Sequence, residues 1–252
     1  MKNIPDIFKI QFCIFLGVLA LVFAMWALRS GDERVGQAEE SYRKGEAAST
    51  ISERKTAFNT ALDLFMKLDA DYQPNLGTGK LDFNLANTYY QLGEYPSAIL
   101  HYQRAEQLMP RSEAVKRNLM QAQKKSELNV EENRRLFDVL LGKTFLSLPE
   151  RLQLFFVLAV LTLIFISGWF WTRNPWLSKA AVFCLIPASI ALLNLVATYY
   201  FSPVDAILIR SEELRRDAGR EFATVGDKPI PGGSSLEVIN TVPNGRWLKV
   251  LA

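Results

Sequence analysis

The chain has 252 residues, of which 49% are apolar and 22% charged, a length that allows one or two compact domains. This composition excludes an intrinsically disordered chain, and two cysteines are too few for a disulfide scaffold. The formal net charge of +3 is too small to indicate a nucleic-acid partner, so none is expected. The apolar residues are concentrated in three uncharged blocks, which separate soluble parts of the chain from membrane-like parts.

The first uncharged block, residues 10–28, follows Lys2 and Lys9. It is just long enough to cross a bilayer as a helix, since about 20 residues span a hydrocarbon core of about 30 Å. We predict that residues 1–30 are an N-terminal membrane anchor, with the two cations placing the N-terminus in the cytoplasm. A cleaved signal sequence is the alternative, although no small-x-small cleavage site follows the block.

The next region, residues 35–130, is rich in good helix formers and has few glycines or prolines inside its periodic runs. Residues 79–112 form a unit with the 34-residue period of a tetratricopeptide repeat, a pair of antiparallel helices. The positions that match this family are Leu85, Ala86, Tyr89, Gly93, Tyr95, Ala98, Tyr102, Ala105 and Pro110. The segment therefore resembles the tetratricopeptide repeat family, from which Asp82 departs because a large apolar residue usually stands there.

Weaker repeats flank this unit on both sides. Residues 35–72 resemble a degenerate repeat whose helices carry Tyr42, Gly45, Ala57, Ala61, Leu64 and Leu68. Residues 113–128 resemble a capping helix or the first helix of a third repeat, with Val115, Leu119 and Ala122 on one face. Because such arrays usually need about three repeats to bury their faces, we expect this one to lean on the membrane, a partner protein or a second copy of the chain.

The resemblance also implies a binding face, since these repeats use the concave surface lined by their first helices. The residues expected there are Phe83, Asn87, Tyr90, Gln91, Arg117, Gln121 and Lys124. Asn87 matches an asparagine with which some family members hold a peptide backbone or carboxylate, while Phe83 stands in place of the assisting lysine. An extended or helical peptide segment is therefore the expected ligand; the alternative is that these are ordinary solvated helix positions.

Residues 131–147 combine apolar side chains with Arg134, Arg135 and Lys143 on the opposite face. This pattern predicts an amphipathic juxtamembrane helix that lies on the lipid surface or packs on the repeats. Residues 147–150, Ser-Leu-Pro-Glu, then predict the start of the next helix.

The second and third uncharged blocks predict transmembrane helices at residues 152–172 and 180–201. Both end in aromatic clusters, which mark a membrane interface. The alternative is a buried hairpin of a soluble core, but neither block has the polar stripe of such a helix. Pro187 and Asn194 inside the third block predict a kink or a helix–helix contact.

Loop charge predicts the orientation of these spans. The short loop at residues 173–179 carries Arg173 and Lys179 and no anion, which places it in the cytoplasm. Residues 30–151 and 203–252 are then on the far face, so the predicted location is a bacterial inner membrane with its soluble regions in the periplasm.

Residues 204–252 predict short strands at 204–210, 221–226, 234–240 and 246–252, separated by turn signals. They resemble a bacterial SH3-like domain. The matching positions are Leu214, Arg215, Asp217, Ala218, Gly219, Phe222, Val225, Gly232, Leu236, Val238 and the run Gly245 to Val250. Trp247 is the candidate ligand-binding residue of this domain, with packing in the core or at the rim as the alternative.

No catalytic or metal-binding constellation stands out. We expect His101 to be a solvated side chain, and Cys13 and Cys184 lie in separate apolar blocks without the spacing of metal ligands. The expectation is therefore a protein that is not an enzyme and needs no cofactor.

The whole order predicts a multidomain membrane protein of α-helical tetratricopeptide repeats, transmembrane helices and a small all-β SH3-like barrel. That order resembles the BatE-type members of the bacterial Bat (aerotolerance operon) proteins. The resemblance implies an inner-membrane scaffold that binds other membrane proteins, among them von Willebrand-A-type Bat proteins, in oxygen or stress tolerance. The alternative is a membrane protein that binds or senses peptidoglycan through the SH3-like domain.

Overall fold

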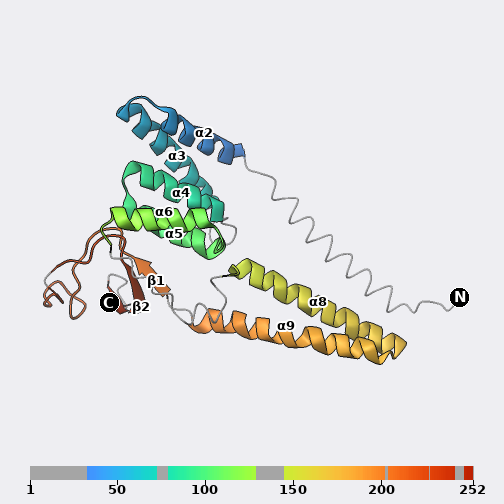
Figure 1. The fold of residues 1–252 in the computed structure, drawn as a ribbon. Coiled ribbons are helices and arrows are strands. Elements are labelled where there is room, and N and C mark those ends of the chain that lie inside the picture. The colour runs from blue at the N-terminus through green and yellow to red at the C-terminus, as the bar shows by residue number, and fades with distance from the viewer. Residues whose placement is uncertain are drawn as a thin grey trace.

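The computed structural model describes residues 33–72, 79–128, 145–201, 204–226, 228–241 and 247–251. The anchor predicted at residues 1–30 and most of the amphipathic helix predicted at 131–147 lie outside these residues. The described chain forms three parts: a stack of helices, a long helical hairpin and a small sheet (Figure 1).

The stack consists of five helices, each of which packs against the next (Figure 1). They are α2 (Glu33–Ala47), α3 (Ile51–Tyr72), α4 (Gly79–Leu92), α5 (Tyr95–Leu108) and α6 (Glu113–Lys125). The stack is therefore two helical pairs followed by a single helix, as the repeat pattern predicts.

The pair α4–α5 has the packing predicted for its repeat. Ala86, Ala98, Ile99 and Tyr102 are buried between the helices and α6, whereas Leu85 is buried on the side of α4 that faces α2 and α3. The small side chains of the two alanines let the helix axes approach closely. The turn between the helices uses Gly93 at φ +82°, a conformation that glycine adopts without steric cost.

The pair α2–α3 packs through a face of α3 that includes most of the predicted positions. Ala61 and Leu68 are buried as part of the core, Leu64 is half-buried against it, and Ala57 is half-buried. The prediction missed Phe58 and Phe65, which are also buried and offer more apolar area than alanine. Gly45 leaves room for one of them, since a Cβ there would lie 2.8 Å from the Phe58 ring.

A buried polar pair occupies the position where Asp82 departs from the repeat pattern. His101 Nδ1 lies 2.9 Å from Asp82 Oδ1, and the two residues are 8% and 4% exposed. The Tyr89 ring stacks on the imidazole at a centroid distance of 5.4 Å. The prediction of a solvated His101 was wrong, because the histidine supplies the partner that a buried carboxylate requires.

The hairpin consists of α8 (Leu148–Thr172) and α9 (Pro175–Phe201), which run side by side and away from the helical stack (Figure 1). Both are long and apolar enough to cross a membrane. The capping box predicted at Ser147 and Glu150 is present, so α8 begins at Leu148. Because Asn174 accepts a hydrogen bond from the backbone N–H of Trp176, α9 begins at Pro175 and the connecting loop is shorter than residues 173–179.

The two hairpin helices meet through small side chains and one polar cluster. Ala181, Cys184 and Ala188 are buried on α9, a stripe that allows close approach in an apolar environment. At the other end of α9, Arg151 Nη1 donates to Asn194 Oδ1 at 3.1 Å and to Thr198 Oγ1 at 2.9 Å. Asn194 therefore makes the helix–helix contact that its place in the block predicts.

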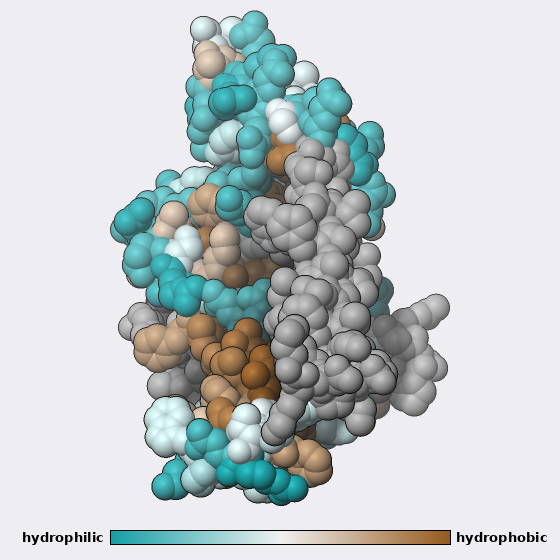
Figure 2. All heavy atoms as spheres, turned by 90° about the vertical axis from the view of Figure 1, so that its right-hand side faces the viewer, coloured by the Kyte–Doolittle hydropathy of each residue, from teal (hydrophilic) through white to brown (hydrophobic). Residues whose placement is uncertain are grey.

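The outer faces of the hairpin are apolar. Large side chains such as Phe156, Leu163, Phe183 and Leu193 are exposed along α8 and α9. In Figure 2 the apolar surface gathers at the level of the hairpin, whereas hydrophilic surface covers the end that carries α2 and α3. The other described residues leave this surface uncovered, and a helix pair of this length and composition could span a membrane.

The C-terminal residues form an antiparallel sheet in the order β1-β2-β3. The strands are β1 (Val204–Ile207), β2 (Ser235–Thr241) and β3 (Leu248–Leu251). The strand predicted at 221–226 is absent from the described residues, where Arg215 and Thr224 make only an isolated bridge. Arg215 instead holds this loop by donating to the carbonyls of Arg220 and Phe222. The observed unit is thus a small three-stranded sheet, and the SH3-like barrel stays a prediction. We call β1, β2, β3 and the described loop residues between β1 and β2 the β unit.

The Asp82–His101 pair yields a stability prediction. Substituting His101→Leu should destabilise the α4–α5 pair by about 3–5 kcal/mol, because Asp82 would remain buried without its partner. The double variant Asp82→Leu/His101→Leu should lose less stability than either single variant, because it buries only apolar groups. Hydrogen exchange of α4 and α5 peptides in the detergent-solubilised chain measures this difference. Additive losses in the double variant would contradict the pairing.

Candidate functional site

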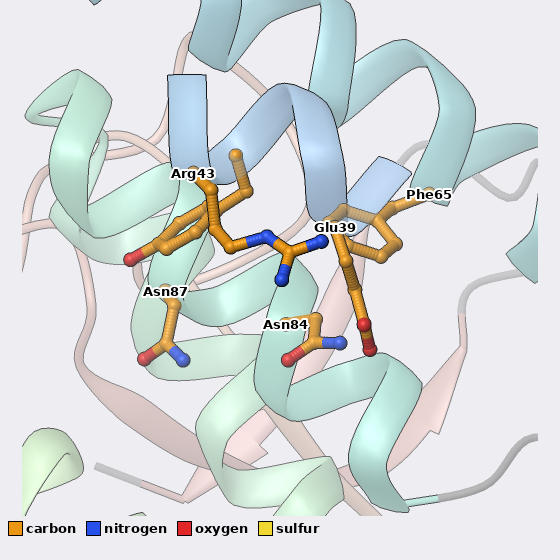
Figure 3. A pocket seen from close by; sticks show the side chains of 6 residues that line it. Glu39, Arg43, Phe65, Asn84 and Asn87 are labelled. Carbon is orange, nitrogen blue, oxygen red and sulfur yellow. The ribbon is translucent and has the colours of Figure 1, made fainter. Parts of the chain in front are cut away.

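A hollow of about 180 Å³ opens between α2, α3 and α4. Its lining residues are Glu39, Tyr42, Arg43, Phe65, Asn84 and Asn87. Phe65 is buried and forms part of the floor, whereas Glu39 and Arg43 are exposed at the rim. Figure 3 shows the Arg43 guanidinium and the Glu39 carboxylate projecting from α2 over the side of α4 that carries Asn84. We call this feature the α2–α4 groove.

Helical spacing places these side chains together. Glu39 and Arg43 are four residues apart on α2, and Asn84 and Asn87 are three apart on α4, so each pair shares one face of its helix. The packing of α3 between the two helices then brings the two faces to one opening. The groove is therefore a product of the repeat stacking, with opposite charges at the rim and two carboxamides on one wall.

Asn87 is tied into the interior of the array. Its Oδ1 accepts a hydrogen bond from the Tyr102 hydroxyl at 2.6 Å and another from Asn118 Nδ2 at 3.0 Å. These contacts join α4, α5 and α6 in one polar network. Burial raises the pKa of Tyr102, so its hydroxyl remains a donor at neutral pH. What Asn87 offers to the groove is its own amide N–H group.

The other binding residues predicted on α4 mostly hold the array together. Phe83 packs on the buried cluster at a ring distance of 6.0 Å from Tyr102. Tyr90 packs edge-on against Tyr95 at 5.5 Å, and Gln91 Oε1 accepts a hydrogen bond from Arg54 at 3.0 Å. The structure therefore brings only Asn87, of the four, to the lining of the groove.

The remaining candidates lie elsewhere. Arg117, Gln121 and Lys124 are exposed on α6 and do not line the groove. Trp247 is half-buried directly before β3. Whether these four residues bind a ligand stays a prediction.

Besides Tyr42 and Phe65, three groove residues were not predicted as binding residues: Glu39, Arg43 and Asn84. The first two lie on the same helix as Tyr42, which marked the degenerate repeat, so applying the concave-face pattern to that repeat would have found them. Among the described residues, no group of three or more His, Cys, Asp or Glu side chains is placed to hold a metal ion. The chemistry that the groove offers is hydrogen bonding and charge.

Comparison with known proteins agrees with the helical stack. Residues 83–112 match the family model described as tetratricopeptide repeat. No curated protein and no solved structure matches the chain. The chain thus carries a tetratricopeptide repeat, the class of helical module that mediates protein–protein interaction.

The polar network at Asn87 can be tested through Tyr102. The variant Tyr102→Phe should lower the free energy of unfolding of the array by about 1 kcal/mol, because it removes one internal hydrogen bond. Tyr95→Phe on the same helix is the matched control. Urea unfolding followed by helical circular dichroism compares them, and equal midpoints for Tyr102→Phe and the wild type would contradict the network.

The stability of the helical array should also depend on pH through Tyr102. Because burial raises the pKa of Tyr102, its stabilising contribution is complete below the ordinary tyrosine pKa of about 10 and is lost as the pH rises further. The wild type should therefore lose more stability than Tyr102→Phe between about pH 9 and pH 12. Parallel losses in the two proteins would contradict this assignment.

Proposed function

We propose that the protein is a membrane-anchored scaffold whose α2–α4 groove binds an extended peptide segment of a partner protein. The observation that carries this proposal is the groove itself, where carboxamides and opposite charges surround an aromatic floor. Its volume of about 180 Å³ is below the range of about 300–1,000 Å³ typical of small-molecule sites. A single side chain of a peptide fits that volume better than a complete small ligand.

The groove residues have complementary roles in this proposal. The amide of Asn84 bonds to the peptide backbone, with the N–H group of Asn87 as a second donor. Tyr42 and Phe65 contact an apolar side chain that enters the hollow. Arg43 and Glu39 at the rim select a peptide with both an acidic and a basic residue, since like charges there would repel.

The hairpin supports the membrane part of the proposal. Helices of 25 and 27 residues are about 37 and 40 Å long, enough to cross a hydrocarbon core of about 30 Å with some tilt. Arg111, which follows α5, forms an ion pair with Glu150 and donates to the carbonyl of Phe145 at 3.3 Å. The α5–α6 end of the stack thus lies at the start of α8, and the α2–α4 groove lies toward the opposite end of the stack (Figure 1).

The finer role is proposed from the sequence. The order of repeats, hairpin and β unit resembles BatE-type proteins, which supports a scaffold in the inner membrane with its repeats and β unit in the periplasm. Other membrane proteins, von Willebrand-A-type Bat proteins among them, are the proposed partners, and oxygen or stress tolerance is the proposed process. Peptidoglycan binding rests on the SH3-like sequence motif alone.

Selection of peptides on the full chain tests the groove. Peptides chosen from a display library on the detergent-solubilised protein should bind Arg43→Ala/Asn84→Ala at least about tenfold more weakly, because the variant removes a charge and a backbone contact. The matched control is Arg104→Ala/Asn59→Ala, whose two side chains are exposed on α5 and α3. Peptides that bind both variants alike would contradict the proposed site.

A further inference from the structure

The β unit is docked on the helical stack through the turn at Pro231-Gly232-Gly233. Gly232 and Gly233 are buried, although turns normally lie in solvent. The Ser126 hydroxyl at the end of α6 donates to the Gly232 carbonyl at 2.7 Å, which joins residues 106 positions apart. The turn is also bonded to the end of β1, because the N–H of Gly233 donates to the Leu208 carbonyl at 2.6 Å.

Close packing explains why glycine occupies both positions. A Cβ at Gly233 would lie 2.7 Å from Cδ1 of Ile99, and a Cβ at Gly232 would lie 3.0 Å from the Pro96 ring. Both neighbours belong to the first turns of α5. Gly233 also has φ +93°, which a residue with a side chain adopts only at a cost.

Apolar contacts accompany the turn. Ile207 of β1 and Leu128 after α6 pack on the buried cluster that contains Ile99, Tyr102 and Leu119. Ile99 is fully buried. The β unit therefore covers the place where the start of α5 meets the end of α6.

We propose that the β unit is a built-in cap of the helical stack and a brace between this stack and the membrane hairpin. Terminal repeats of such arrays require a cap, because each repeat leaves one apolar face for a neighbour. Here the chain supplies the cap itself, three residues after α9 ends at Phe201. The β unit attaches the stack to the end of α9, and the Arg111–Glu150 ion pair attaches it to the start of α8. This role is independent of what the α2–α4 groove binds.

The chain offers a matched pair of glycines for a test. Gly226 lies in the same unit at φ +88°, but a Cβ there would meet nothing within 4 Å. The variants Gly233→Ala and Gly226→Ala therefore impose the same backbone strain, and only the first disturbs the docking contact. A difference between them isolates the contact from the strain.

Hydrogen exchange of the full chain in detergent is the measurement. Peptides from α5 and α6 should exchange at least about fivefold faster in Gly233→Ala than in Gly226→Ala, since crowding a packed contact weakens it. Ser126→Ala should raise exchange of the same peptides by about fivefold through loss of one hydrogen bond, and it keeps the test open should Gly233→Ala fail to fold. Equal exchange in Gly233→Ala and Gly226→Ala, or no effect of Ser126→Ala, would overturn the proposal.

Discussion

The architecture depends on whether water or lipid surrounds the apolar outer surface of α8 and α9. Phe183 and Leu193 are among many large side chains exposed along these helices, a surface that water would oppose strongly. Within each helix most backbone hydrogen bonds are satisfied internally, apart from the one that Pro187 of α9 cannot donate, so lipid can surround the pair at little cost to the peptide groups. Because α8 and α9 form a hairpin, the segments before α8 and after α9 leave it at the same end.

That common end explains how the soluble parts cooperate. The helical stack reaches the hairpin through Arg111, and the β unit reaches the stack through Gly232 and Gly233. A short repeat array that would otherwise lean on another molecule is thereby supported within its own chain. The proposed result is a platform that is attached to the hairpin at its α5–α6 end and presents the α2–α4 groove toward the other end of the stack.

Much of this fold follows from local sequence patterns. Small alanines, Tyr102 and the turn at Gly93 predict the α4–α5 pair, because each acts between neighbouring helices of one repeat. The Asp82–His101 pair was not predictable in this way, since Asp82 stood out at an apolar position of the repeat but no local pattern joins it to a histidine 19 residues later. The docking of Gly232 also escaped prediction, because a Pro-Gly-Gly sequence indicates a turn but not the surface that the turn contacts.

The candidate site shows the same limit. The concave-face pattern found Asn87 but could not show that Tyr102 and Asn118 occupy its oxygen. It also missed Arg43 and Glu39, because the concave-face pattern was applied to the clear repeat and not to the degenerate one before it. Some side chains on the concave face are free to bind a ligand, and others make contacts inside the array. The packing of adjacent helices shows which side chains belong to each group.

Reporter fusions after residues 128, 176 and 252 test the central claim most directly, because they locate both ends and the loop of the hairpin. The account predicts that the fusions after 128 and 252 report the periplasm and the fusion after 176 reports the cytoplasm. Fusions after 128 and 252 on opposite faces of the membrane, or all three on one face, would contradict it.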